Sequence, residues 1–419
     1  TVNTLKLRAS YGSLGNQNID NWYQTYSTVD YKSVSGTWLQ GGKKTNITAA
    51  PGLVSAALGW EKVESYDVGL DWGAFNNRLT GSFDYYVRNT KDMVGPAPEL
   101  PALLGTDVPK TNNTDLRTTG WELQIGWRDH LENGLNYGVT FNVSDAQAKV
   151  TRYPNNPTGS LDSYIENRKV GEIWGYETIG IAKTNDEMNQ HLATLPNGGQ
   201  SQLGDKWAAG DIMYKDLDGD GKISNGSNTL ADHGDLKVIG NNTPRYLFGL
   251  DLTASWKGFD FRAFMQGVMK RDYNVNGSWG AREYLFGATD SGVWWAAGIT
   301  GVQDYFRDSE TWSVKNGYES ENLNAYLPRP QYSEKNIHTQ TRYLLNAAYL
   351  RMKNLQIGYT LPQSLVSKAG LGNVRFFVSA ENLFTITDLP SQFDPETIDT
   401  DYGNGYPLSR TFSFGVNVP

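Results

Sequence analysis

Residues 410–419 alternate strictly between apolar and polar side chains. Phe412 and Phe414 would lie on one face of a β-strand and Ser413 on the other, because successive side chains of a strand point in opposite directions. About ten segments along the chain repeat this pattern. Strands with one apolar and one polar face, joined alternately by short turns and long loops, predict an all-β fold, a transmembrane antiparallel β-barrel of outer-membrane type.

Each alternating segment has about the 9 to 11 residues that a tilted strand needs to cross a bilayer. Several apolar rows carry Trp or Tyr at both ends, as at Trp121 and Trp127. Such placement is typical of the aromatic girdles at the two membrane interfaces. The predicted strands lie at about residues 4–13, 65–72, 78–88, 121–128, 135–144, 246–256, 259–266, 354–361, 374–381 and 411–418.

The alternation also assigns each side chain to a face. The opposite face of these strands bears many charged residues, which suits a water-filled lumen and not a dry core. The residues expected to face lipid are Leu123, Ile125, Phe141, Leu250 and Phe414. Those expected to face the lumen are Gln124, Asn142, Asp251 and Ser413.

The connections between the predicted strands differ in length. Short turns are expected near residues 75–77, 132–134 and 257–258, with a longer one at 363–373. Long loops are expected at about residues 14–60, 90–117, 151–244, 272–348 and 385–408. Short periplasmic turns and long extracellular loops are typical of outer-membrane barrels, which places the C-terminus on the periplasmic side.

Composition narrows the class of protein further. No run of about 18 apolar residues is present, which argues against a transmembrane helix. The net charge of −8 argues against a nucleic-acid partner, and the absence of Cys excludes disulfides and thiol chemistry. The sequence opens directly on a strand, without a signal peptide. Because a barrel protein must be exported, we interpret the chain as a processed or truncated piece.

An acidic segment carries the first half of a calcium-binding loop. Such loops place carboxylates at positions 1, 3 and 5, a Gly at position 6, a backbone carbonyl at position 7 and a Glu at position 12. Ser227 stands at the twelfth position, so the loop is incomplete, and Asp232 or Asp235 is the candidate to close the coordination shell. The alternative is a turn rich in Asp and Gly that caps its own backbone. The candidate ligands of a structural calcium are Asp216, Asp218, Asp220, Lys222 through its carbonyl, and Asp232.

Aromatic residues crowd the predicted loop 272–348. Aromatic rings beside polar side chains suit stacking on a sugar or capture of a peptide. The alternative is that they pack the loop on itself or against a partner. The candidate substrate contacts are Trp279, Tyr284, Trp294, Trp295 and Trp312.

Catalytic chemistry has little support in the sequence. The chain has four His and no Gly-x-Ser-x-Gly nucleophile motif. His233 beside Asp232 and Asp235 is the one pairing that a ten-strand outer-membrane protease could use. We therefore predict no catalytic residue and keep the protease as an alternative function.

Several segments in order along the whole chain resemble the C-terminal barrel half of SusC/RagA-type TonB-dependent transporters. The resemblance implies a barrel of 22 strands, of which this chain would supply about the last ten, with an N-terminal plug that the sequence does not include. The family usually ends on an aromatic residue, and Pro419 departs from that. The segments that carry the resemblance are 5–12, 210–223, 243–246, 256–260, 349–355, 381–385 and 406–412.

The function that this resemblance implies is energised import of oligosaccharides or peptides across the outer membrane. It implies a SusD-like surface lipoprotein as a lid and TonB as the source of work through the plug. Besides the protease, a soluble calcium-binding β adhesin remains an alternative. Family order also implies that residues 4–13 pair with a strand outside this sequence, so that the chain does not close into a ten-strand barrel.

Overall fold

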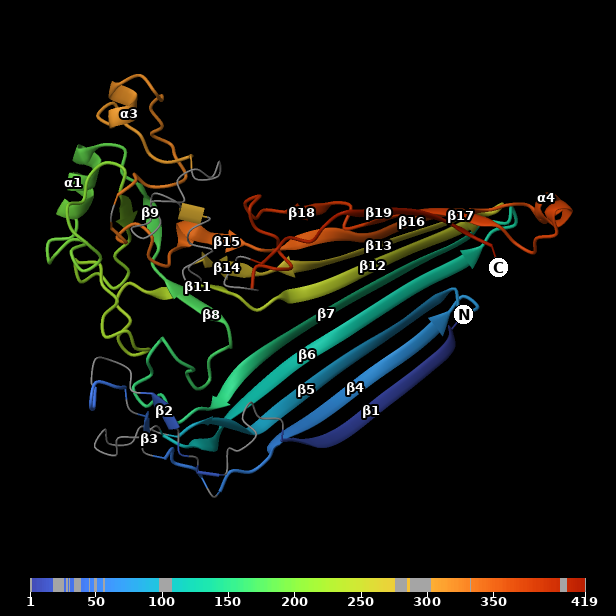
Figure 1. Ribbon diagram of the computed structural model, residues 1–419, viewed down its shortest axis with the longest axis horizontal. Helices are drawn as coiled ribbons and strands as arrows, with labels where there is room; N and C mark the ends of the chain where they lie inside the picture. Colours follow the sequence, from blue (N-terminus) through green and yellow to red (C-terminus); the bar gives the residue numbers. More distant parts are fainter. Residues whose placement is uncertain are drawn as a thin grey trace.

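The computed structural model describes residues 2–17, 26–27, 29, 31–33, 39–44, 46–48, 51–55, 57–97, 108–275, 285–286, 303–331, 333–399 and 405–418. Within these ranges, no helix combines the length and the apolar character needed to cross a lipid bilayer. The description below refers to this part of the chain, which divides into a large sheet and a loop domain built from the long connections (Figure 1).

One antiparallel sheet runs through the molecule (Figure 1). The main strands are neighbours in the sheet in the same order as in the sequence. The short strand β18 (Thr385–Thr387) also pairs with β16. All ten predicted strands are confirmed. They are β1 (Val2–Asn16), β4 (Glu61–Ala74), β5 (Leu79–Pro96), β6 (Lys110–His130), β7 (Asn136–Arg152), β12 (Arg245–Trp256), β13 (Phe259–Lys270), β16 (Tyr349–Thr360), β17 (Arg375–Glu381) and β19 (Thr411–Asn417).

The predicted long loop at residues 90–117 is wrong, because β5 and β6 continue through most of it. Asn89 still pairs with Arg117, and Met93 pairs with Thr114 after a register shift. These outer ends of the two strands carry mostly polar residues, so the alternation that marks a bilayer crossing is absent although backbone pairing continues. The connection shrinks to residues 97–109.

The short connections all lie at one end of the sheet, together with both chain termini (Figure 1). Phe75, Asn76 and Asn77 form the β4–β5 turn with φ of 55°, 60° and 60°. Lys257 and Gly258 form the β12–β13 turn, also with positive φ, a conformation that Gly adopts without steric cost. The β16–β17 connection contains α4 (Gln363–Val366) and η7 (Ser367–Ala369). The predicted difference between the two ends of the strands is thus confirmed.

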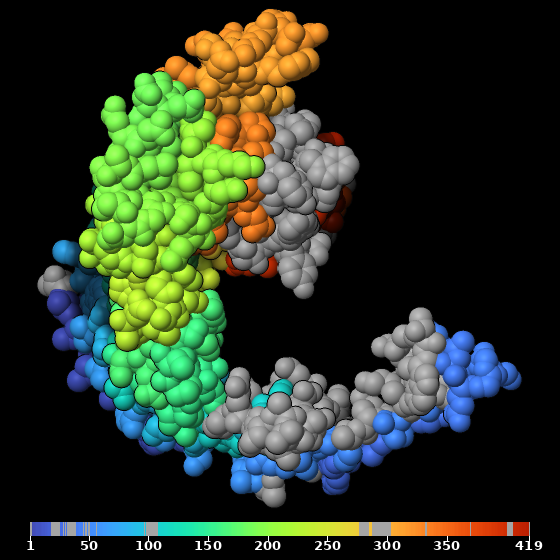
Figure 2. All heavy atoms as spheres, turned by 90° about the vertical axis from the view of Figure 1, so that its left-hand side faces the viewer, coloured from blue at the N-terminus to red at the C-terminus, as the bar shows by residue number. Residues whose placement is uncertain are grey.

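The sheet does not close on itself. Strand β1 pairs with β4 and β19 pairs with β17, and these two strands are the opposite ends of the pairing order. Figure 2, which looks onto the long-loop end, shows the described residues along an arc around an open space. The expectation that this chain is not a closed ten-strand barrel is confirmed. An unpaired edge in lipid leaves backbone groups unsatisfied at several kcal/mol each, so both edges need pairing partners in a membrane.

Register places the apolar side chains on one face. Ile125, Phe141 and Leu250 are successive partners across β6, β7 and β12. Leu123 lies between its partners on β5 and β7 in the next apolar row, and Phe414 on β19 is 87% exposed. These side chains form no sealed core.

The alternation partners lie on the opposite face. Gln124 pairs with Asn142 across β6 and β7, and Ser413 pairs with its counterpart on β17. Asp251 on β12 accepts hydrogen bonds from Arg262 of β13 at 2.9 and 3.2 Å. The predicted division of the sheet into an apolar and a polar face is confirmed.

Ion pairs on the polar face reach across intervening strands. Arg8 on β1 contacts Asp71 of β4 at 2.9 Å and also Asp84 of β5 at 2.8 Å. The guanidinium passes over Gly69, where an added Cβ would collide with both the Asp84 carboxylate and the Arg8 side chain. At the other end of the sheet, Gly358 leaves the same space for a pair between β17 and β13. Glycines on the middle strand therefore allow these charges to meet.

The hydrophobic core lies in the loop domain and not between the main strands. The long connections fold into small sheets and helices at the end of the barrel strands (Figure 1). They contain β2 (Tyr31–Ser33), β3 (Asn46–Thr48), β8 (Glu172–Gly175), β9 (Thr178–Ile181), α1 (Asn185–Ala193), β10 (Ile212–Tyr214), β11 (Lys237–Asn241), β14 (Asp272–Asn274), α3 (Trp312–Lys315), η6 (Thr341–Tyr343) and β15 (Leu344–Asn346). Its largest buried cluster includes Tyr176, Ile212, Tyr214, Phe286, Leu327 and Tyr343.

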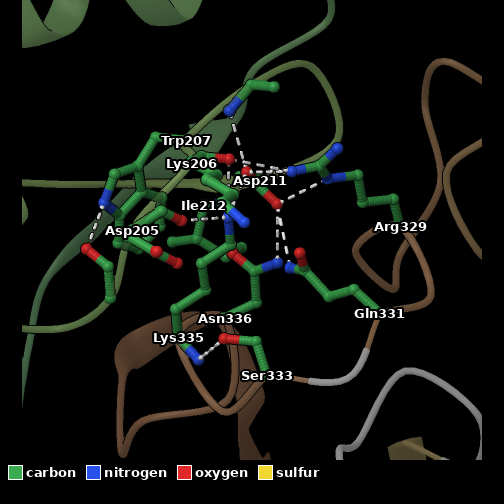
Figure 3. A network of polar contacts seen from close by, with 12 residues as sticks. Asp205, Lys206, Trp207, Asp211, Ile212, Arg329, Gln331, Ser333, Lys335 and Asn336 are labelled. Atoms are coloured by element: carbon green, nitrogen blue, oxygen red, sulfur yellow. Dashed lines mark hydrogen bonds and ion pairs between the residues drawn. The ribbon is translucent and has the colours of Figure 1, made fainter.

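A buried carboxylate joins two of these long connections (Figure 3). Asp211, which is fully buried, accepts hydrogen bonds from Arg329 at 2.8 Å to each oxygen and from Gln331 and Asn336 at 3.0 Å. The Lys335 ammonium lies 2.9 Å from the same carboxylate. We call these five residues the Asp211 network. Because its members are up to 125 residues apart in sequence, the network fixes segments 205–212 and 329–336 against each other.

The hydrogen bonds of the Asp211 network favour the charged form of the carboxylate, whereas burial lowers the pKa of Lys335. Burial alone would raise the pKa of Asp211, but hydrogen bonds from Arg329, Asn336 and Lys335 outweigh it and hold that pKa below the ordinary value. Lys335, 2% exposed, also donates to the carbonyls of Asp205 at 2.9 Å and Lys206 at 3.0 Å. Each buried charge is therefore compensated by hydrogen bonds as well as by an opposite charge.

Adjacent residues on β6 provide a test of the two faces. We expect Ile125→Arg to cost about 2 to 4 kcal/mol of unfolding free energy in lipid, because it moves a charge onto the apolar face. Gln124→Arg should be nearly neutral, because its side chain lies on the polar face. The measurement is urea unfolding of the full-length protein in vesicles. Equal costs for the two variants would contradict this assignment of faces.

A second test concerns the Asp211 network. Asp211→Ala leaves Arg329 and Lys335 without their buried counterion and should destabilise the loop domain by about 3 to 5 kcal/mol. Hydrogen exchange should then rise in segments 205–212 and 329–336 while the barrel strands stay protected. Glu310→Ala is the control, because its exposed pair with Lys315 should contribute less than about 1 kcal/mol. Unchanged exchange in Asp211→Ala would show that the network does not hold the loop domain together.

Candidate functional site

Two adjoining cavities open in the loop domain, and we call them together the Trp174 cavity. The larger has a volume of about 590 Å³ and the smaller about 390 Å³. Both are lined by Leu161, Asp162, Glu172 and Trp174, so Trp174 lies at their common boundary. Cavities of several hundred Å³ are of the size that small ligands occupy.

Trp174 is held in place from several sides. It lies on β8, which pairs with β11, and its residue partner there is Val238. The Arg168 guanidinium lies 5.3 Å from the indole ring centre, and the His233 ring lies at 5.4 Å. Arg168 is itself fixed by an ion pair with Glu172 at 2.7 Å. The aromatic ring at the cavity boundary therefore has a fixed orientation.

The cavity lining combines aromatic rings with side-chain amides. The larger part is lined by Trp174, Tyr176 and Tyr273 together with Asn225, Asn228, Asn242 and Asn274. Burial, assisted by Asp235, raises the pKa of Tyr176 to about 12, so its hydroxyl stays protonated. Of the lining carboxylates, Asp162 accepts from Asn228 at 2.7 Å and Asp399 pairs with Arg271. This set of amide, hydroxyl and carboxylate groups offers hydrogen-bond donors and acceptors that suit hydroxyl or amide groups of a polar ligand.

The acidic segment brings three carboxylates together in the same loop domain. Asp216, Asp218 and Asp235 each offer an oxygen, and these oxygens lie within 4.8 Å of one another. Of the residues expected to hold calcium, Asp216 and Asp218 are therefore in the cluster. Of the two candidates to close the coordination shell, Asp235, which is fully buried, lies in the cluster and Asp232 does not.

The remaining candidate ligands make other contacts. Asp232 accepts from the Ser227 amide at 3.0 Å and from its hydroxyl at 2.5 Å, which turns its carboxylate away from the cluster. Asp220 accepts from the Lys222 amide at 3.0 Å and lies 3.3 Å from the Lys222 ammonium. Asp235 joined the cluster instead because its carboxylate receives the Leu217 amide at 2.6 Å, which ties it to the Asp216–Asp218 turn.

The same segment also caps its own backbone, as the alternative explanation expected. Asp216 accepts from the amides of Gly219 at 2.6 Å and Gly221 at 3.0 Å. Burial raises the pKa of Asp235, and the nearby carboxylates of Asp218 and Asp216 add to this effect. Three carboxylates at this separation repel one another, and a cation would relieve the repulsion.

The predicted aromatic substrate contacts are only partly visible. Trp279, Tyr284, Trp294 and Trp295 lie outside the described residues. Trp312 lies on α3, is 70% exposed and stacks on Tyr318 with ring centres 5.4 Å apart. This stacked pair lies on the lobe farthest from the sheet (Figure 1).

His233 does not form a catalytic pair. Its ring hydrogen bonds the Gly234 carbonyl at 3.1 Å and packs on Trp174. The Asp235 carboxylate accepts from the backbone amides of Leu217 and Ser224, and Asp232 accepts from Ser227. Among the described contacts, neither carboxylate orients the imidazole, which the protease alternative would require.

Sequence analysis did not identify the Trp174 cavity or the Asp211 network. Trp174 and Tyr176 stand only two residues apart in a predicted loop, a local concentration of aromatic residues that could have drawn attention to this segment. Asp211 lies within the resemblance segment 210–223, but its partners lie more than a hundred residues away. Only the folded loops bring them together.

Comparisons with known proteins agree with this architecture. No family model matches the chain. The chain is 31% identical to TonB-dependent receptor P3 of Formosa agariphila over 443 residues, which cover 100% of the chain and 39% of that receptor. It is 24% identical to TonB-dependent receptor SusC of Bacteroides thetaiotaomicron, covering 100% of the chain and 38% of SusC.

The fold matches a solved structure over the whole chain. The structure of the RagAB peptide transporter aligns with a TM-score of 0.67 at 24% identity, covering 100% of this chain and 41% of that one. The chain thus spans about two fifths of the length of the proteins that it matches. From the sheet, the asymmetry of its two ends and these relatives, we identify the chain as a β-barrel portion of a TonB-dependent receptor of the SusC/RagA type.

Proposed function

We propose that the chain is part of an energised importer that carries oligosaccharides or peptides across the outer membrane. It would work with a SusD-like surface lipoprotein that covers the extracellular side and with TonB as the source of work. The chemistry is binding and gated passage, without bond cleavage. The observation that carries the proposal is a polar, ion-paired sheet face below a loop domain that contains a polar-aromatic cavity.

Two features support this proposal over the alternatives. The apolar face of the sheet is exposed along its width, which suits lipid and would leave a soluble adhesin with a large unburied surface. The relatives are receptors and a transporter, and one of them is named as a peptide transporter. The amide-rich lining of the Trp174 cavity suits both substrate classes.

The test is uptake by cells that make the full-length receptor. Cells should take up a labelled oligosaccharide mixture or a labelled peptide mixture, and a protonophore that removes TonB energisation should abolish uptake. We expect Trp174→Ala to reduce uptake at least fivefold at limiting substrate, because the boundary of the cavity collapses or opens. Uptake that persists without energy, or cleavage of the substrate by the purified protein, would contradict the proposal.

Trp312→Ala is the matched comparison, because Trp312 is an exposed aromatic residue that does not line the cavity. If the Trp174 cavity binds substrate, uptake at low substrate concentration should be closer to the wild-type value in Trp312→Ala than in Trp174→Ala. A larger loss in Trp312→Ala would instead place the aromatic contact at the tip of the lobe, as the sequence-based hypothesis expected.

We further propose that the cluster of Asp216, Asp218 and Asp235 holds a structural calcium. Calcium prefers six to eight oxygen ligands at about 2.3 to 2.6 Å, and carboxylates of adjacent turns are its usual protein ligands. Its role would be to fix the connection between β7 and β12, because a connection of this length is otherwise prone to adopt several conformations.

Calorimetric titration of calcium into the full-length receptor tests this site. We expect Asp218→Asn to weaken binding at least tenfold and to speed proteolysis of the loop domain, while the barrel stays folded. Asp232→Asn is the control and should bind calcium like the wild type, because its carboxylate faces Ser227. Absence of a calcium signal in the wild type would reduce the motif to a turn that caps its own backbone.

A further inference from the structure

We propose that the apolar face of the sheet binds an anionic phospholipid at the short-turn end, with an acyl chain in a groove over β16, β17 and β19 and the phosphate near Lys257. The groove is continuous with the face that the barrel presents to the membrane. The proposal depends on this membrane placement and is independent of what the receptor transports.

The first wall of the groove is an aromatic row next to the short turns. Register makes Trp256, Phe259, Tyr359, Phe376 and Val416 successive partners across β12, β13, β16, β17 and β19. The rings of Phe259 and Tyr359 lie 4.5 Å apart. Aromatic residues at this level of a barrel lie at the membrane interface.

The second wall is the next row on the same face, one step further from the short turns. Ile357, Val378 and Phe414 are successive partners on β16, β17 and β19. Their exposed fractions are 50%, 57% and 87%. This wall is aliphatic on β16 and β17 and aromatic on β19.

Between the two rows lies a groove of about 470 Å³. Its floor is the backbone of Gly358, Phe377 and Gly415, which pair with one another across the three strands. The side chains of this floor row point to the opposite, polar face, where a Cβ added at Gly358 would meet Asp260 and Arg375, and the backbone groups of the floor belong to the sheet ladder. The groove offers apolar walls, and its floor strands β16 and β17 are paired on both sides and have no free ladder edge for a peptide strand, which favours a hydrocarbon chain over a peptide.

A positive charge lies at the end of the aromatic row. Lys257 occupies the β12–β13 turn, and its ammonium lies 4.6 Å from the centre of the Trp256 ring. Within the described ranges, no carboxylate lies within salt-bridge distance of this ammonium. A lysine at an interface keeps its charge at the level of the headgroups while its stem covers apolar surface. An apolar groove beside such a charge matches an acyl chain joined to a phosphate.

The headgroup chemistry follows from which leaflet the groove faces. The short turns are the periplasmic end of this fold, and the periplasmic leaflet of an outer membrane is made of phospholipid. A Lys near the surface adds about 1 kcal/mol to the binding of an anionic lipid. Lys257 should therefore make the groove prefer phosphatidylglycerol to the zwitterionic phosphatidylcholine.

Native mass spectrometry of the full-length receptor in detergent tests the site, with dioleoylphosphatidylglycerol and dioleoylphosphatidylcholine titrated separately. We expect the wild type to retain phosphatidylglycerol more tightly. Lys257→Gln should reduce this preference about fivefold, which corresponds to about 1 kcal/mol. Phe376→Ala should weaken both lipids together, because it opens one wall of the groove without changing its charge.

The control is Lys315→Gln, which removes a charge from the extracellular lobe, where Lys315 pairs with Glu310. It should bind both lipids like the wild type. Heat-modifiable gel mobility confirms that each variant is a folded barrel. If Lys257→Gln keeps the full preference for phosphatidylglycerol, or loses no more of it than Lys315→Gln does, the receptor holds annular lipid only. The proposal is then overturned. The same conclusion follows if Phe376→Ala leaves the binding of both lipids unchanged.

Discussion

Backbone hydrogen bonding across the sheet is the constraint on which the rest of the structure depends. A strand in hydrocarbon has no water to satisfy its amides and carbonyls, so each strand must pair along its length with two neighbours. The eight inner strands of the path do so, from β4 to β17. The side chains of the sheet do not have to form a hydrophobic core. One face can therefore contact lipid while the other carries charges.

The sheet and the loop domain are consequently stabilised by different interactions. The main strands bury few side chains and are joined on the polar face by ion pairs that cross over glycines, as between Arg8 and Asp84 over Gly69. The loop domain has the packed apolar cluster that a soluble domain would have. Within the loop domain, the Asp211 network compensates the buried charges of Asp211 and Lys335. A water-exposed loop domain needs its own core, since no bilayer supports its shape.

This division bears on transport. The proposed import would require a path that a polar substrate can follow, and the polar face of the sheet together with the Trp174 cavity offers groups that could exchange hydrogen bonds with it. The cavity lies in the same loop domain as the Asp211 network and the acidic cluster. In the proposed importer, a loop domain at one end of the strands would let separate parts of one chain perform substrate recognition and membrane anchoring.

The sequence by itself determined the strands, their two faces, the asymmetry of their ends and the resemblance to SusC/RagA-type receptors, because an alternating period of two residues is a local property. The prediction of a long loop at residues 90–117 was wrong for the same reason, because strand pairing continues there although the local alternation stops. Only the tertiary structure decided which loop residues meet. Asp211 and Arg329 are 118 residues apart, and the fold selected Asp235 over Asp232, the two candidates that the sequence left open. Such contacts depend on how distant loops fold onto one another, and no local pattern in the chain records that.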